Sequence, residues 1–74
     1  MNEYEILIET INPCGGEARA NREIVEAEAE SPEAYVKVKA PYPVIDRLMT
    51  PDGDTLIITG DGSDSIVRYT FTEL

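Results

Sequence analysis

The stretch Arg22-Glu23-Ile24-Val25-Glu26-Ala27-Glu28-Ala29-Glu30 decides the fold, because its composition and its pattern point to different structures. Alanine, glutamate and arginine are strong helix formers, so intrinsic propensity favours a helix over residues 16–30. On such a helix, however, the apolar side chains would fall on two nearly opposite sides and leave no single apolar stripe. In a strand, Val25, Ala27 and Ala29 share one face, and the other face holds Glu26, Glu28 and Glu30. The pattern predicts a strand over 22–30, with a helix over 16–30 as the alternative.

The segment that follows supports the strand. Residues 31–34, SPEA, read as a turn, and residues 35–40, YVKVKA, alternate between apolar and polar side chains. If Ser31 and Ala34 face each other in a hairpin, Glu28 lies opposite Lys37 and Glu26 lies opposite Lys39. Cross-strand pairs of opposite charge contribute roughly 0.2–1 kcal/mol each. The sequence therefore predicts an antiparallel hairpin of residues 22–30 and 35–40.

The rest of the chain is typical of a small, strand-rich domain. Alternation predicts a strand over 3–10, and two apolar runs predict strands over 55–59 and 66–73. A short helix is predicted over 43–49, because proline suits the first helical turn and Pro51 ends the segment. The predicted fold class is mainly β, a small α+β domain spanning 1–74, with about five antiparallel strands in a barrel-like roll. A helix over 16–30 would change this to α+β with a longer helix.

The charge balance excludes several classes of function. The 74 residues include 15 acidic and 6 basic side chains and no histidine, for a net charge of −9. Residues 1–33 hold nine glutamates against Arg19 and Arg22. Such a chain repels nucleic acid and anionic membrane surfaces, both of which select basic proteins. Without histidine, the Ser-His-Asp and Cys-His catalytic pairs are also excluded.

The single cysteine, Cys14, lies in the glycine-rich stretch Asn12-Pro13-Cys14-Gly15-Gly16. Backbone amides of such a turn can stabilise a thiolate, which makes Cys14 a candidate reactive thiol. A nearby carboxylate, Glu17, is expected to raise the pKa of the Cys14 thiol instead, and no lysine lies nearby in sequence. An unreactive thiol in a turn is therefore the favoured interpretation. One cysteine forms no internal disulfide, and the acidic N-terminus is unlike a signal peptide. We therefore expect a cytoplasmic protein.

Aspartates in glycine-containing turns provide the hard oxygen ligands that calcium prefers. If residues 60 and 65 close the last hairpin, Phe71 lies opposite Asp54 and Glu73 lies opposite Asp52. Asp52, Asp54 and Glu73 would then form a three-carboxylate metal site, which is preferred to the loop that contains Asp61 and Asp64. The favoured interpretation is nevertheless that these carboxylates are solvated turn residues and that the protein has no cofactor; the alternative is calcium, bound weakly.

Two features indicate a protein partner. Tyr42 lies between Pro41 and Pro43, where a stiff aromatic side chain loses little entropy on docking. The glutamates Glu26, Glu28 and Glu30 form a ladder that suits a partner with a basic surface, although the lysines of the predicted hairpin favour a solvated face that is neutralised within the chain. The predicted function is a non-enzymatic, cytoplasmic protein-interaction module, and the alternative is a weak calcium-binding protein that uses its aspartate-rich turns.

Overall fold

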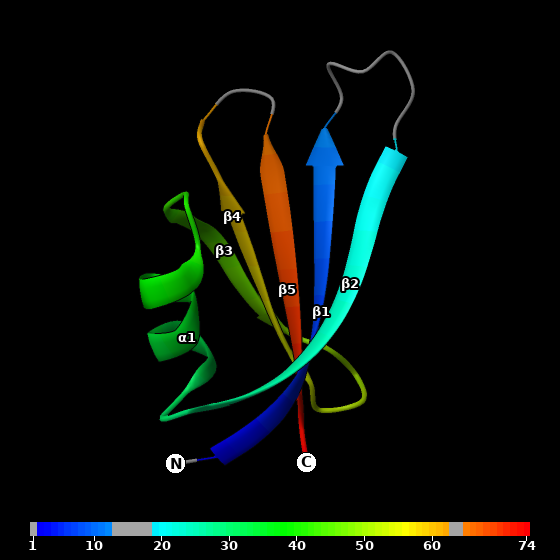
Figure 1. Cartoon of the computed structure of the whole chain (residues 1–74), viewed down its shortest axis with the longest axis vertical. Helices are drawn as coiled ribbons and strands as arrows, with labels where there is room; N and C mark the ends of the chain where they lie inside the picture. The colour runs from blue at the N-terminus through cyan, green and yellow to red at the C-terminus, as the bar shows by residue number, and fades with distance from the viewer. Residues whose placement is uncertain (1, 13–18, 63–64) are drawn as a thin grey trace.

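The structure, a computed structural model, describes residues 2–12, 19–62 and 65–74 and forms one antiparallel sheet with one helix. The elements are β1 (Asn2–Asn12), β2 (Arg19–Ala29), α1 (Pro32–Lys39), β3 (Val44–Met49), β4 (Thr55–Gly60) and β5 (Ile66–Glu73). The strand order is β2-β1-β5-β4-β3, and α1 crosses one face on its way from one edge strand to the other (Figure 1). The predicted fold class is confirmed: mainly β, five antiparallel strands and one short helix. The sheet is open, so a barrel-like roll describes it only loosely.

Strand β2, Arg19–Ala29, confirms the predicted strand over 22–30 to within one residue, and the helical alternative over 16–30 is wrong for the described residues 19–30. The strand pairs with β1 along its whole length, from Asn2 opposite Ala29 to Asn12 opposite Arg19. Its alternating pattern places Val25, Ala27 and Ala29 on the core side, where they pack with β1 and α1. Burial of one face of a long hairpin therefore outweighs the helix propensity of alanine and glutamate.

The predicted hairpin of residues 22–30 and 35–40 is wrong, because residues 35–40 do not form a strand. They belong to α1, whose N-cap is Ser31: its Oγ accepts a hydrogen bond from the Ala34 amide at 3.1 Å. Pro32 opens the helix, Glu33 lies in its first turn, and Lys37 and Lys39 lie in its last turn. Each of these residues favours a helix at the position it occupies, and the N-cap hydrogen bond alone stabilises the helix by about 1 kcal/mol. The lysines therefore do not form the predicted cross-strand pairs with Glu26 and Glu28, although Lys39 lines a pocket together with Glu28 and Glu30.

The predicted helix over 43–49 is also wrong, because Val44–Met49 is the edge strand β3. It pairs with β4 and contains a register shift between Val44 and Asp46. Val44 and Ile45 are β-branched and suit a pleated surface better than a helix. The predicted numbers of strands and helices are still correct, because one predicted strand is a helix and the predicted helix is a strand.

Strands β4 and β5 lie where the sequence predicts them, but their register differs by one residue. Thr55, and not Asp54, lies opposite Phe71, while Gly60 lies opposite Ile66. The loop explains the difference, because the Asp61 amide donates to the Ser65 carbonyl at 3.3 Å and closes the hairpin between these two residues. Glu73 lies opposite Tyr4 of β1.

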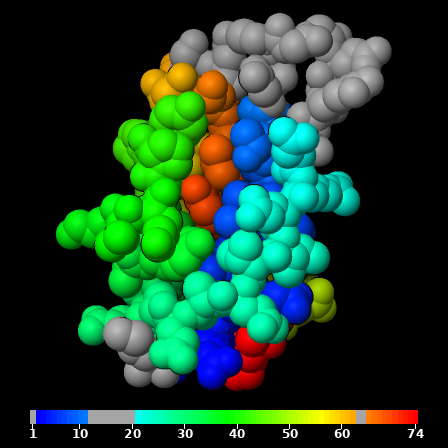
Figure 2. All heavy atoms as spheres, viewed as in Figure 1, coloured from blue at the N-terminus to red at the C-terminus, as the bar shows by residue number. Residues whose placement is uncertain are grey.

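The core lies between α1 and the inner face of the sheet, which we define as the face beneath α1. Phe71 is at its centre: its ring centroid lies 5.6 Å from that of Tyr4 and 5.7 Å from that of Tyr35, both edge-on. Val36 is the buried residue of α1, with 2% of its surface exposed. Figure 2 shows α1 and β2 on either side of β5 and β1, whose orange and blue atoms are visible between them. The helix thus covers one face of the sheet.

We expect Phe71→Ala to destabilise the protein more than any change on the opposite face. The side chain is 2% exposed and contacts aromatic rings from β1, β5 and α1. Its removal leaves a cavity and should lower the free energy of unfolding by about 3–5 kcal/mol. Urea denaturation measures this change. Thr72→Ala, one residue along the same strand, is the control, and a similar loss in both variants would contradict this account of the core.

We expect the Tyr69 hydroxyl to make stability depend on pH at high pH. Burial raises its pKa above the ordinary value of 10.0, and the nearby Tyr35 adds to the shift. Because the unfolded chain loses this proton first, the contribution of Tyr69 is complete below about pH 10 and is lost as pH rises through the folded-state pKa. Urea denaturation at about pH 8 and about pH 11 should show a smaller loss of stability in Tyr69→Phe than in the wild type. Equal losses would show that Tyr69 does not carry the effect.

Candidate protein-binding face

Four glutamates form a compact group on the outer face, which we define as the face of the sheet away from α1. Glu3 lies directly opposite Glu28, and Glu5 lies directly opposite Glu26, in the ladder between β1 and β2. All four side chains are exposed. Tyr4 and Ala27, which alternate with them, point to the core. We call Glu3, Glu5, Glu26 and Glu28 the acidic block.

The acidic block has no neutralising partner within residues 2–12, 19–62 and 65–74. No hydrogen bond or ion pair joins its carboxylates to another side chain there. Directly opposed residues on one face have Cβ atoms about 4.5–5.5 Å apart, and like charges at this distance destabilise a sheet. The sequence singled out Glu26 and Glu28, but the structure places them against Glu3 and Glu5 instead of Lys37 and Lys39.

A pattern in the sequence could have revealed this pairing. The β1–β2 register is symmetric about the pair Gly15-Gly16, a common turn signal between two alternating segments. That symmetry places glutamate against glutamate twice and Glu9 against Arg22 once. The alternative hairpin of residues 22–30 and 35–40 places opposite charges across from each other, so the charge pattern alone favours it over the pairing with β1.

Glu9 shows how the same face neutralises a carboxylate. Its Oε2 lies 3.3 Å from Nε of Arg22 and 3.5 Å from an Nη of Arg68, on the two neighbouring strands. The Glu9 side chain is only 12% exposed, so this carboxylate is both paired and largely shielded from solvent. The described arginines of the outer face, Arg22 and Arg68, therefore neutralise Glu9 and not the acidic block. The uncompensated negative charge of this face lies mainly in the acidic block.

A row of four aliphatic residues and one central threonine lies beside the acidic block on the outer face; its three middle members are partly buried. Consecutive pairs in the ladders align five residues, one from each strand: Ile24, Leu7, Thr70, Leu56 and Leu48. We call them the outer row. Ile24 is 64% exposed and Leu48 is 47% exposed, at the two ends. The row runs from one edge of the sheet to the other.

Tyr42 and Glu30 lie apart from the acidic block. Tyr42 is partly buried and packs against the core, in the segment between α1 and β3. Glu30 follows β2 and is exposed, and its backbone carbonyl accepts a hydrogen bond from Asn2 Nδ2 at 3.5 Å. The structure thus brings together Glu26 and Glu28 from the predicted partner-binding set and leaves the other two elsewhere.

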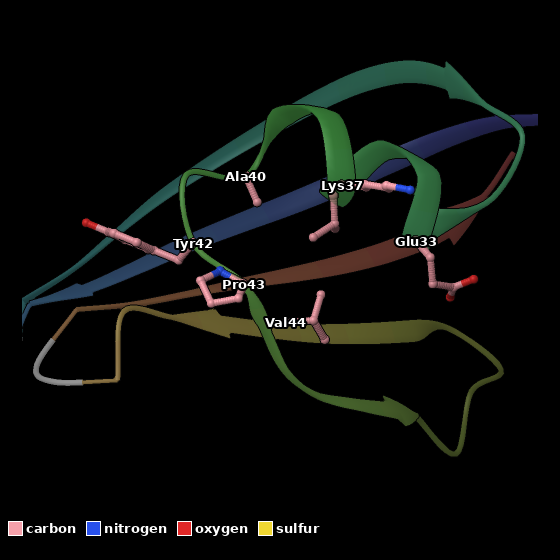
Figure 3. Close-up of a pocket in the computed structure, with 7 residues that line it drawn as sticks. Glu33, Lys37, Ala40, Tyr42, Pro43 and Val44 are labelled. Atoms are coloured by element: carbon pink, nitrogen blue, oxygen red, sulfur yellow. The ribbon is translucent and has the colours of Figure 1, made fainter.

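A pocket of about 370 Å³ lies between α1 and β3 (Figure 3). In this view Ala40 and Val44 point toward one another across it, while the Tyr42 ring extends away. Most of the lining is apolar, and its charged members are Glu33 and Lys37. Arg47 of β3 forms an ion pair with Glu33, which ties the helix to the edge strand at this pocket. The pocket offers apolar contact area to a small group, with few polar atoms to orient it.

The carboxylates predicted to hold calcium are dispersed. Asp52 is exposed in the turn before β4, Asp54 bonds to Thr50 through its backbone amide and carbonyl, and Glu73 pairs with β1. Among the described residues, no three acidic or cysteine side chains are close enough to hold a metal ion. The calcium hypothesis remains a prediction without a ligand cluster in this part of the chain. Cys14 and Asp64 lie outside the described residues.

Comparison with known proteins adds no relative. No protein family, curated protein or solved structure matches the chain. Within the described ranges, no helix has the length and apolar character needed to cross a membrane. The geometry and charge of the described residues are therefore the only support for the candidate site.

We expect Glu26→Lys to stabilise the protein. The new ammonium lies opposite Glu5 and replaces a repulsive pair by an attractive one, which should raise the free energy of unfolding by about 1 kcal/mol. Urea denaturation at low ionic strength measures the gain, and added salt should reduce it. Glu23→Lys has the same net charge but lies opposite Ile8, and it should give a smaller gain. Equal gains would assign the effect to net charge alone.

Proposed function

We propose that this chain is a non-enzymatic, cytoplasmic protein-interaction module whose acidic block binds a basic surface on another protein. The observation that carries the proposal is the pair of directly opposed glutamates, Glu3 against Glu28 and Glu5 against Glu26. Each pair destabilises the isolated sheet, and a lysine at any of the four positions would relieve it. Local rules of this kind are commonly broken where a surface serves binding.

The arrangement suits an extended cationic surface better than a metal ion. The four carboxylates lie in two rows on a flat part of the sheet and are exposed to solvent. They do not converge on one point, and no metal-binding group of three is present in the described chain. A basic protein surface presents several ammonium or guanidinium groups at comparable spacing, and such complementarity accelerates association. The net charge of −9 adds long-range attraction to the same class of partner.

A labelled oligolysine peptide tests the proposal by fluorescence anisotropy. We expect the wild type to bind it at about 20 mM salt and more weakly at about 150 mM salt. Glu5→Gln/Glu26→Gln should weaken binding about tenfold, because it removes one of the two opposed pairs of the site.

The matched control is Glu23→Gln/Asp52→Asn, which removes the same amount of charge from exposed positions outside the acidic block. This control should lose no more than about threefold in affinity. Equal losses in the two double variants would show that only net charge matters, and the acidic block would then not be a binding site.

A further inference from the structure

The outer face of the sheet carries aliphatic side chains besides its charged groups and the threonines Thr70 and Thr72, and no described element covers it. Helix α1 packs on the inner face, where the buried side chains lie. The outer face holds the outer row and, near it, Ile58 and Ile45. The Ile45 side chain lies over Gly60, where a Cβ would come within 2.5 Å of its Cδ1. A sheet with an aliphatic surface on both faces has a second surface available for packing.

The edge of β3 is a less suitable docking surface, although four of its large apolar residues are exposed. The register shift between Val44 and Asp46 interrupts its hydrogen-bonding pattern. Asp46 Oδ1 accepts a hydrogen bond from the Arg47 amide at 2.8 Å, so a local side chain occupies a donor of the edge strand. Bulges and charged residues are devices that protect edges from further strand pairing. Leu48 therefore contributes to the outer face more readily than to an added strand.

Charge selects the kind of molecule that can cover the outer face. The acidic block borders the outer row on one side, because Glu5 and Glu26 occupy the next position along β1 and β2. A second copy of the chain would bring two molecules of net charge −9 together. A basic partner gains from the same field and leaves the aliphatic row to be buried.

The dimensions of the outer row suit a helix. Five strands at ~4.8 Å spacing give a row roughly 19 Å long. A helix of about 13 residues has this length at 1.5 Å per residue, and its pitch of about 5.4 Å is close to the spacing of the strands. Apolar side chains on successive turns can therefore lie near successive members of the row, with basic side chains on the flank that faces the acidic block.

We infer that the outer face binds a basic amphipathic helix of a partner protein, whose apolar side chains pack on Ile24, Leu7, Leu56 and Leu48 and whose lysines or arginines face the acidic block. This inference rests on the proposed function and adds to it the apolar contact and the form of the partner. Binding should therefore keep part of its strength when salt screens the charges, because burial of aliphatic side chains is not screened.

Two synthetic helical peptides of about 14 residues provide the probes: one with leucines at every third or fourth position among lysines, and one with serines in place of the leucines. We expect the leucine peptide to bind the wild type at least about tenfold more tightly at about 150 mM salt. Ile24→Thr/Leu48→Thr should remove most of this gain. Val38→Thr/Met49→Thr, which alters two exposed residues off the outer face, should keep it.

The amide NMR spectrum of the wild type gives a second measurement that needs no variant. The leucine peptide should shift amides at the outer row and the acidic block more than those of α1. Equal affinity for the two peptides, or a leucine gain that survives Ile24→Thr/Leu48→Thr, would overturn the inference. The proposed function would still stand if both peptides lost affinity in Glu5→Gln/Glu26→Gln.

Two further outcomes separate the alternatives. If the leucine peptide binds through the outer row but is insensitive to Glu5→Gln/Glu26→Gln, the proposed function fails and with it the basic character of the partner. Sedimentation tests the remaining occupant: a wild-type dimer that Ile24→Thr/Leu48→Thr converts to a monomer would show that the outer face belongs to a second copy, which would also overturn the inference.

Discussion

The packing of α1 on Phe71 is the interaction on which the rest of the structure depends. Tyr35 and Val36 bring the helix against the rings of β1 and β5, at the centre of the sheet. The helix also lies in the connection between the two edge strands, so its docking fixes the positions of both β2 and β3. An open sheet of this size needs one covered face to exclude water from its aromatic side chains, and a single helix of eight residues provides that cover.

Covering one face makes the two faces of the sheet chemically different. The inner face holds Tyr4, Ile6, Ile57 and Phe71, all buried. The outer face holds the acidic block, the Glu9 ion pairs and the outer row. Opposed glutamates are tolerated there because water screens them, whereas the same pairs on the inner face would require desolvation of four charges. The fold can therefore accept the repulsion in the acidic block at a modest loss of stability.

Local pattern predicted four strands correctly: alternation gave residues 3–10 and 22–30, because a half-buried strand imposes a period of two on its own sequence, and apolar runs gave 55–59 and 66–73. The prediction of which strands pair with each other was less successful. Glu26 and Glu28 were identified as binding residues, but the hairpin with Lys37 and Lys39 made them appear neutralised. Ser31 and Pro32 signal a helix start, and the alternation of residues 35–40 hid that signal. The acidic block was missed as a unit because Glu3 and Glu28 are 25 positions apart and Glu5 and Glu26 are 21 positions apart, and the opposite charges of residues 35–40 favoured the competing hairpin.

The sequence by itself determined the strand-rich class, the strong negative charge, the exclusion of histidine chemistry and the exposure of glutamates on alternating strands. These properties follow from composition and from the two-residue period, which do not depend on what each strand pairs with. Only the tertiary structure decided that residues 32–39 are helical, that 44–49 form an edge strand, and that, of the two hairpins the sequence allows, β2 forms the one with β1. Those outcomes depend on which surfaces are buried against each other. The free energy of burial comes from contacts between segments that are far apart in the chain, so no single segment determines it. The pairing of distant segments also aligned the outer row, Ile24, Leu7, Thr70, Leu56 and Leu48, across the five strands.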